Sequence, residues 1–177
     1  LENYAGKNFI SDVSPEDCAV IIFTSGTTGR GKGVMLSHGN LMDNTFCSTE
    51  KECQDDEVFL NVLPIHHVFC LNGDVFLVMR YGSTLCLNNS LSKMLYYIQL
   101  FQPSVMRIVP MMAKTLYNKI SMTAHQHPEM SLQEAKESVL GKRLHKIISG
   151  GGYLSESVAA NFLKLNITIG QGYGMSE

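Results

Sequence analysis

The sequence has no tryptophan, few prolines and no excess of charge of either sign. It has 14 Lys and Arg residues and 16 Asp and Glu residues, so the formal net charge is -2. Nucleic acids and anionic membrane surfaces are usually bound by clustered basic side chains, which this sequence does not supply. Long hydrophobic runs are also missing. No stretch reaches the roughly 18 apolar residues of a membrane-spanning helix, and Arg80 interrupts the best candidate. We therefore expect no nucleic-acid partner and no membrane-spanning segment.

The cysteines show no pattern of pairing. They are five in number, and no two of them are spaced as C-x-x-C. This predicts reduced thiols rather than a disulfide framework or a zinc site. The first residues do not combine a charged segment with an apolar run, so no signal peptide is visible. Together these features predict a cytoplasmic protein.

The 177 residues are 45% hydrophobic, which suffices for about one domain with a buried core. Short apolar runs rich in β-branched residues alternate with amphipathic runs, such as the one in which Leu91, Leu95 and Ile98 share a face. This alternation predicts an α/β fold with a mostly parallel sheet flanked by helices, its strands buried on both faces. The predicted strands are residues 19–23, 58–63, 83–87, 105–109, 145–148 and 167–169.

Capping residues predict where several helices begin. Pro110 suits the first position of a helix, because its fixed φ and missing N–H cost little there. Ser131 and Glu134 have the spacing of a capping box, and Ser155 is a good N-cap for a later helix. Residues 121–130 are polar and predict a surface loop.

The sharpest local signal is the glycine-rich segment 24–33, TSGTTGRGKG, which directly follows the first predicted strand. Glycines let a backbone approach a ligand closely, and hydroxyl and ammonium groups supply the many donors that a polyphosphate needs. The segment therefore predicts a phosphate-binding loop. Its candidate contact residues are Thr24, Ser25, Gly26, Thr27, Thr28, Gly29 and Lys32.

Two kinds of phosphate-binding loop compete for this segment. Gly26 to Lys32 has the G-x-x-x-x-G-K spacing of a P-loop, which would make the protein a nucleotide hydrolase or a kinase-like module. A P-loop continues with Ser or Thr and enters a helix at once, whereas here Gly33 follows and residues 33–36 predict an extended strand. A helix is expected only from about Ser37. This favours a loop at the tip of a β-hairpin, with the P-loop as the alternative.

Three further motifs each follow a predicted strand: residues 64–69 (PIHHVF), 149–153 (SGGGY) and 170–177 (GQGYGMSE). The carboxyl ends of parallel strands lie at one edge of a sheet, where open α/β sheets bind their ligands. We therefore expect these motifs and the glycine-rich loop to gather at one edge, although they lie far apart in the sequence.

The four motifs, in this order, resemble the signatures of the adenylate-forming (AMP-binding) superfamily, and most of all those of fatty-acid and other long-chain acyl-CoA synthetases. The family usually has Pro before the loop lysine, where this sequence has Gly31. The resemblance implies activation of a carboxylic acid, such as a fatty acid, by ATP to an acyl-adenylate. Coenzyme A would then accept the acyl group, with an acyl carrier protein as the alternative acceptor, and Mg²⁺ would be the metal cofactor.

The resemblance also implies a role for each motif. His67 would lie at the carboxylate end of the acid, Lys32 at the β- and γ-phosphates, and Glu177 would bind Mg²⁺, so these three are the catalytic candidates. Judged by itself, His67 could equally be a partly buried histidine that bonds to backbone. The nucleotide-binding candidates outside the loop are Ser149, Gly150, Gly151, Gly152, Gly172, Tyr173, Gly174 and Ser176, with Tyr173 stacking on adenine.

The resemblance covers nearly the whole chain, but the family's domain continues beyond the position of Glu177. A downstream aspartate that binds ribose, and a small C-terminal domain that carries a lysine, have no counterpart in residues 1–177. We therefore expect residues 1–177 to be part of an AMP-binding domain, with little ligase activity alone. A non-catalytic binding module is a further hypothesis; loss of the glycine-rich loop or of Glu177 would mark it, and both are present.

Overall fold

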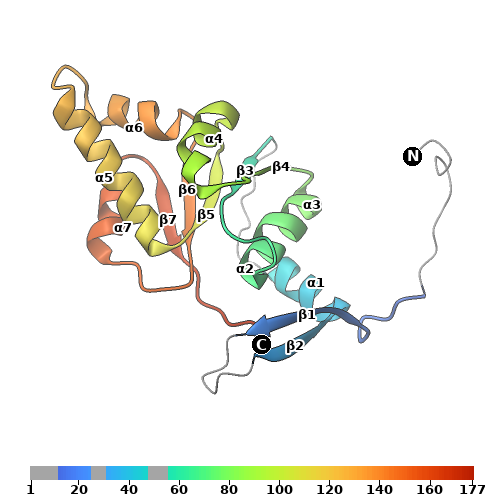
Figure 1. Cartoon of the computed structure of the whole chain (residues 1–177). Coiled ribbons are helices and arrows are strands. Elements are labelled where there is room, and N and C mark those ends of the chain that lie inside the picture. Colours follow the sequence, from blue (N-terminus) through green and yellow to red (C-terminus); the bar gives the residue numbers. More distant parts are fainter. Residues whose placement is uncertain (1–11, 25–30, 48–55) are drawn as a thin grey trace.

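The computed structural model of the chain describes residues 12–24, 31–47 and 56–177 (Figure 1). A five-stranded parallel sheet has the order β4-β3-β5-β6-β7, and a separate two-stranded antiparallel sheet is formed by β1 and β2. The predicted class, α/β with a mostly parallel sheet, is confirmed. The strands are β1 (Cys18–Thr24), β2 (Lys32–Ser37), β3 (Val58–Asn61), β4 (Thr84–Leu87), β5 (Val105–Ile108), β6 (Lys146–Ser149) and β7 (Thr168–Gln171).

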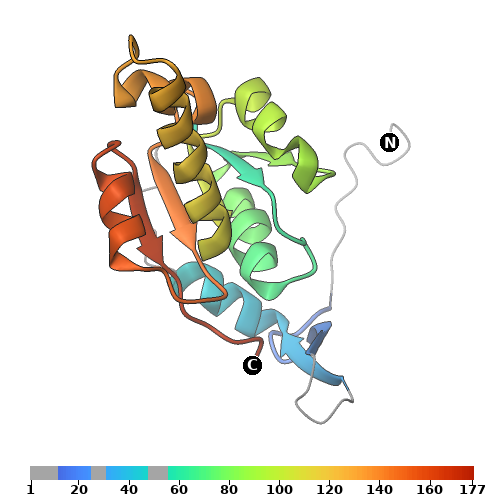
Figure 2. The same ribbon diagram turned by 60° about the vertical axis from the view of Figure 1, so that its left-hand side comes forward.

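Helices cover both faces of the parallel sheet. On one face Leu60 and Met106 belong to the larger core, which α4, α5, α6 and α7 close. On the other face Phe59 and Val105 pack with Leu77 of α3. In Figure 2 the long helix α5 crosses in front of the sheet. The helices are α1 (His38–Cys47), α2 (Val68–Cys70), α3 (Leu77–Tyr81), α4 (Met94–Phe101), α5 (Pro110–Gln126), α6 (Leu132–Leu140) and α7 (Glu156–Leu163), with a π-helical turn η2 (Leu71–Phe76) and a 3-10 turn η3 (Leu91–Lys93).

The predicted helix starts are confirmed. Pro110 opens α5. Ser131 caps α6, where its hydroxyl accepts from the Glu134 N–H and the Glu134 carboxylate accepts from the Ser131 N–H. The hydroxyl of Ser155 caps α7 by accepting from the Val158 N–H. At α1, Ser37 Oγ accepts from the backbone N–H of Asn40, as expected of an N-cap.

Three expectations are wrong or incomplete. The first predicted strand is neither buried nor part of the parallel sheet, since β1 pairs antiparallel with β2 and leaves Phe23 75% exposed. An apolar run alone cannot show which of its faces will be covered. The expected loop at 121–130 begins only after Gln126, because the α5 helix continues past the buried Ile120. The helical segment from α2 to α3, residues 68–81, was not predicted at all.

Within the described ranges, no helix is both long and apolar enough to cross a bilayer.

Candidate functional site

The predicted motifs lie at the carboxyl ends of three parallel strands. Residues 64–69 follow β3, the glycine motif 149–153 begins with the last residue of β6, and residues 172–177 follow β7. In Figure 2 the arrowheads of β6 and β7 point toward the end of the molecule where the β1–β2 hairpin and the C-terminal residues lie, and Figure 1 shows the same arrangement. The three motifs therefore lie at one edge of the sheet.

The ring of Phe69 joins all three motifs. A Cβ atom on Gly150 would lie 2.8 Å from Phe69 Cζ, and one on Gly172 would lie 3.5 Å from Phe69 Cε2. The Gly172 N–H donates to the carbonyl of Ser149 at 2.8 Å, and the Leu154 N–H donates to Gln171 Oε1 at 3.3 Å. The two glycines thus leave room for the ring of a residue far before them in the sequence, and a larger side chain at Gly150 would clash with that ring.

His67 begins the helical segment at this edge. Its Nδ1 accepts the backbone N–H of Phe69 at 3.2 Å and so caps α2, while the rest of the ring is exposed. A ring nitrogen that accepts carries no proton, so this bond puts the proton of the neutral imidazole on Nε2. The bond to backbone that the sequence left open is therefore present, but the His67 ring is exposed and not partly buried. Its neighbour His66 is exposed too.

The glycine motif presents backbone and one hydroxyl. Ser149 is fully buried, and its Oγ has no hydrogen-bond partner. Gly151 has φ 73°, a left-handed conformation that suits glycine, and makes the turn that exposes the next residues. Tyr173 beyond β7 is 92% exposed, so its ring is free to stack on a planar group. Gly152 and Gly174 are exposed beside these residues.

The phosphate-loop candidates lie on the hairpin. Thr24 and Lys32 are paired across β1 and β2, and Lys32 is exposed. The loop residues Ser25, Gly26, Thr27, Thr28 and Gly29 lie outside the described residues. Residues 33–36 belong to β2, so the lysine enters a strand and not a helix. A P-loop needs helical N–H groups directly after its lysine, so the P-loop alternative is not favoured.

Helix α1 links the hairpin to the His67 segment. Asn72 Nδ2 donates to Asn44 Oδ1 at 2.8 Å, and Arg80 donates to the carbonyl of Thr45 at 2.8 Å. Arg80 also lies over the ring of Phe46, 4.3 Å from its centroid. Helix α1, which directly follows the hairpin that carries Lys32, thus packs against the segment that starts at His67.

Glu177 and Ser176 end the described chain at the same edge. The carboxylate of Glu177 is exposed, and Ser176 is half-buried beside it. Carboxylate and hydroxyl oxygens are hard ligands of the kind that Mg²⁺ takes, usually together with phosphate oxygens and water. The residues present therefore fit a magnesium–nucleotide complex in chemistry. Among the described residues, no group of three or more His, Cys, Asp or Glu side chains is placed to hold a metal ion.

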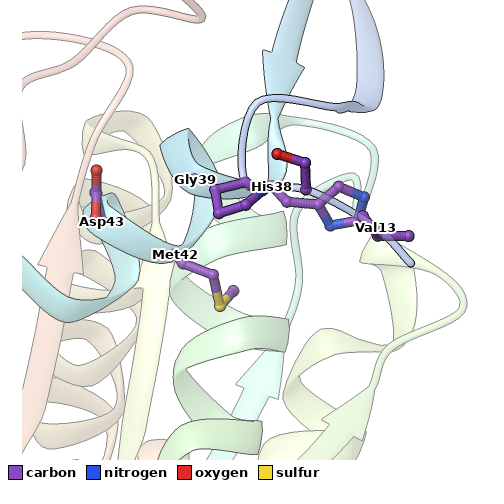
Figure 3. A pocket seen from close by; sticks show the side chains of 7 residues that line it. Val13, His38, Gly39, Met42 and Asp43 are labelled. Atoms are coloured by element: carbon purple, nitrogen blue, oxygen red, sulfur yellow. The ribbon is translucent and has the colours of Figure 1, made fainter. Parts of the chain in front are cut away.

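An open hollow of about 500 Å³ lies elsewhere, between the segment before β1 and the start of α1 (Figure 3). None of the predicted site residues lines it. Its polar lining consists of Ser14, His38 and Asp43 on an open surface, which offers no set of donors for a triphosphate. We therefore place the candidate site at the carboxyl edge of the sheet and not in this hollow. The lining residues are Val13, Ser14, Pro15, His38, Gly39, Met42 and Asp43.

Sequence reasoning missed Phe69 and the buried ion pair of Asp74 and Arg107, 2.8 Å apart. Phe69 lies within a motif that the sequence did single out, but nothing there showed which glycines its ring would meet. A charged residue inside an apolar strand run was a usable signal for Arg107, since buried charges are almost always paired.

The comparisons with known proteins agree with the fold and with the family that the motifs resemble. A family model described as AMP-binding enzyme matches residues 3–177. The chain is 28% identical to 4-coumarate–CoA ligase 1 of Arabidopsis thaliana over 94% of its own length and 29% of that protein. It is 27% identical to crotonobetaine/carnitine–CoA ligase of Proteus mirabilis over 96% of its length and 31% of that protein. The crystal structure of apo MatB from Rhodopseudomonas palustris superimposes with a TM-score of 0.72 at 27% identity, over 99% of this chain and 33% of MatB.

Proposed function

Since the chain belongs to the AMP-binding enzyme family, we propose that it forms the nucleotide-binding part of an acid–thiol ligase. The acid's carboxylate attacks the α-phosphorus of ATP, the bond to the β-phosphate breaks, and pyrophosphate leaves. The thiol of coenzyme A then attacks the acyl carbon of the acyl-adenylate, and AMP leaves. The observation that carries this proposal is the meeting of three motifs around Phe69 at the carboxyl edge of the parallel sheet.

Each candidate residue has a role that its chemistry supports. Lys32 on the hairpin supplies a cation for the β- and γ-phosphates. His67 donates Nε2–H to a carboxylate oxygen of the acid, because its Nδ1 is occupied by the Phe69 N–H. Tyr173 stacks on the adenine against the backbone of Gly150 to Gly152. No side chain forms a covalent intermediate, so positioning and charge stabilisation carry the rate.

Ser149 gives this proposal a particular point of contact. A buried hydroxyl without a partner costs free energy, and such groups are rare in folded proteins unless a ligand or water completes them. We infer that Ser149 Oγ bonds to the bound nucleotide. Glu177 would hold Mg²⁺, which supplies positive charge against the phosphates.

The names of the relatives given above refer to different acids, and we propose a fatty acid for this protein on the basis of its residues 64–69 and 173–177. The chain spans about 30% of the length of its curated relatives. We propose that it works within a longer polypeptide, here called the full-length parent, and has little ligase activity without the rest. Free thiols at Cys18, Cys47, Cys70 and Cys86 support a reducing compartment, the cytoplasm.

The test is acid-dependent exchange of pyrophosphate into ATP by the full-length parent, with fatty, hydroxycinnamic and carnitine-type acids as the panel. Lys32→Ala and Glu177→Ala should each lower the exchange by about 100-fold or more, the usual loss for a group that stabilises developing charge. Lys142→Ala and Glu129→Ala, exposed residues at the opposite edge, are the matched controls and should change nothing. Equal exchange in all five proteins would remove the site.

A further inference from the structure

A buried ionic network lies between the sheet and the helical segment that starts at His67. Asp74 of η2 and Arg107 of β5 form an ion pair, with Oδ1 and a guanidinium nitrogen 2.8 Å apart, and the two side chains are only 1% and 2% exposed. Asn61, at the end of β3, donates to Asp74 Oδ2 at 2.8 Å. Arg107 also lies 5.7 Å from the ring centroid of Phe59. One carboxylate thus joins the segment to two strands of the sheet.

The backbone of η2 is shaped around this pair. A Cβ atom on Gly73 would come within 2.7 Å of Arg107 Cζ and 2.8 Å of its Cδ, so only a glycine lets the π-helical turn approach the guanidinium this closely. π-Helical turns inside helices are rare and are found most often at functional sites. The close approach of Gly73 to Arg107 and the ion pair of Asp74 with Arg107 therefore occur at the same π-helical turn.

Such a pair is poorly explained as a device for stability. Taking two charges out of water costs several kcal/mol for each, and apolar side chains of the same volume often fold equally well. What an ion pair adds is a fixed geometry, because its hydrogen bonds allow one arrangement of the two elements where apolar packing allows several. The element fixed here is the one that begins at the candidate catalytic His67.

Backbone hydrogen bonds connect this part of the segment to His67. The carbonyl of His67 accepts the backbone N–H groups of Cys70 and Leu71, both at 2.9 Å. η2 follows directly, with Asp74 in its second half. We propose that Asp74 and Arg107 are positioning residues that hold His67 and Phe69 in place against the glycine motif. This inference rests on the proposed function.

The variants separate positioning from stability. Asp74→Leu combined with Arg107→Met removes both charges and fills the same space with apolar side chains. Met is chosen for position 107 because an unbranched side chain fits in the narrow space beside Gly73. Arg107→Lys keeps the charge but loses the planar fork. The control is His145→Gln, which breaks the contact of His145 with the buried Glu57 at the opposite edge. Thermal unfolding of the chain is measured for each variant alongside the two readouts below.

The first readout is kinetic, in the full-length parent. Because the double variant leaves the Asn61 amide without its acceptor, we expect it to unfold a few degrees below the wild type and to stay folded at the assay temperature. It should raise the KM for the acid about 10-fold in pyrophosphate exchange while the KM for ATP changes less than about 2-fold. Arg107→Lys should give an intermediate KM for the acid, and His145→Gln should leave both constants unchanged. A double variant or an Arg107→Lys variant with wild-type kinetics would overturn the inference, as would an equal rise in both KM values.

The second readout needs no activity. Amide hydrogen exchange at Cys70 and Leu71 of the chain should become at least about 10-fold faster in the double variant, while the amides of Ile147 and Ile148 in β6 keep their rates. Unchanged exchange at Cys70 and Leu71 would overturn the inference even if the KM rose. If the wild-type parent shows no acid-dependent exchange of pyrophosphate, the proposed function has failed, and the amide rates alone decide the role of the pair.

Discussion

The two edges of the parallel sheet are built from the same strands but treat their polar groups differently. At the amino edge nearly every group has a partner. Ser104 Oγ accepts the Val58 N–H at 2.8 Å, the buried carboxylate of Glu57 lies 3.1 Å from His145 Nε2, and Arg143 bonds to Asp56. These contacts tie the starts of β3, β5 and β6 together. Ser83 Oγ, just before β4, is the exception that the structure shows at this edge, since it is buried without a partner.

The carboxyl edge pairs some of its polar groups, such as Asn61 with Asp74, and leaves others without a protein partner. His67 and Tyr173 are exposed, Ser149 Oγ is buried without a partner, and glycines replace side chains where the motifs meet. We propose that the carboxyl edge is the one that binds a ligand. Variants placed in matched positions at the two edges can break this comparison.

The largest difference in the free energy of unfolding is expected between variants of two buried serines. Ser104→Ala at the amino edge leaves the Val58 N–H without its acceptor and should lower the free energy of unfolding by about 1–3 kcal/mol. Ser149→Ala at the carboxyl edge removes a hydroxyl that has no partner, so stability should stay within about 0.5 kcal/mol of wild type or rise. Urea unfolding of the two variants measures both values. A Ser149→Ala loss as large as that of Ser104→Ala would show that the edges do not differ in this way.

A smaller effect should separate two glycines within the carboxyl edge. Gly150→Ala brings a Cβ to 2.8 Å from Phe69 Cζ, so the ring must move, at a cost of about 1 kcal/mol because Phe69 is only half-buried. Gly172→Ala is the matched control, since its Cβ would meet the same ring at an ordinary 3.5 Å and should cost less than about 0.5 kcal/mol. Urea unfolding gives both costs, and the NMR shifts of the Phe69 ring should change only in the first variant. Equal costs would mean that the ring does not fix the distance between the motifs.

The sheet and its helix caps could be predicted because local chemistry decides them. The apolar run at 105–109 became β5, and the capping box of Ser131 became the start of α6. The extended backbone after Lys32 followed from Gly33 and β-branched Val34, and it correctly disfavoured a P-loop. Each of these features depends on residues a few positions apart.

The remaining features depend on partners far away in the sequence. The run at 19–23 was apolar enough for a buried strand, yet its exposure depends on which elements pack against it. The π-helical turn needs Gly73 to meet Arg107, thirty-four residues on, and no local pattern predicts that meeting. Phe69 was visible as part of a motif, but its contacts with Gly150 and Gly172 exist only in three dimensions.

Cys70 offers the finest test of how the carboxyl edge is held, since its thiol lies one helical turn after His67 and is fully buried. Burial, and then the negative charge of Asp74, raise the pKa of Cys70 to about 12 from an ordinary 9.0.

At pH 8 the thiolate fraction is then about a thousandfold lower than for an ordinary thiol, so iodoacetamide should label exposed Cys18 and Cys47 long before Cys70. Because the unfolded chain loses this proton near pH 9 and the folded chain keeps it, the contribution to stability is full below pH 9 and is lost as the pH rises toward 12. Mass spectrometry of the labelled peptides, with the chain in urea as the control in which Cys70 reacts like the others, measures the protection. Labelling of Cys70 at the rate of Cys18 in the folded chain would mean that the His67 segment opens readily, and the open polar groups of this edge would then reflect loose packing instead of a preformed binding surface.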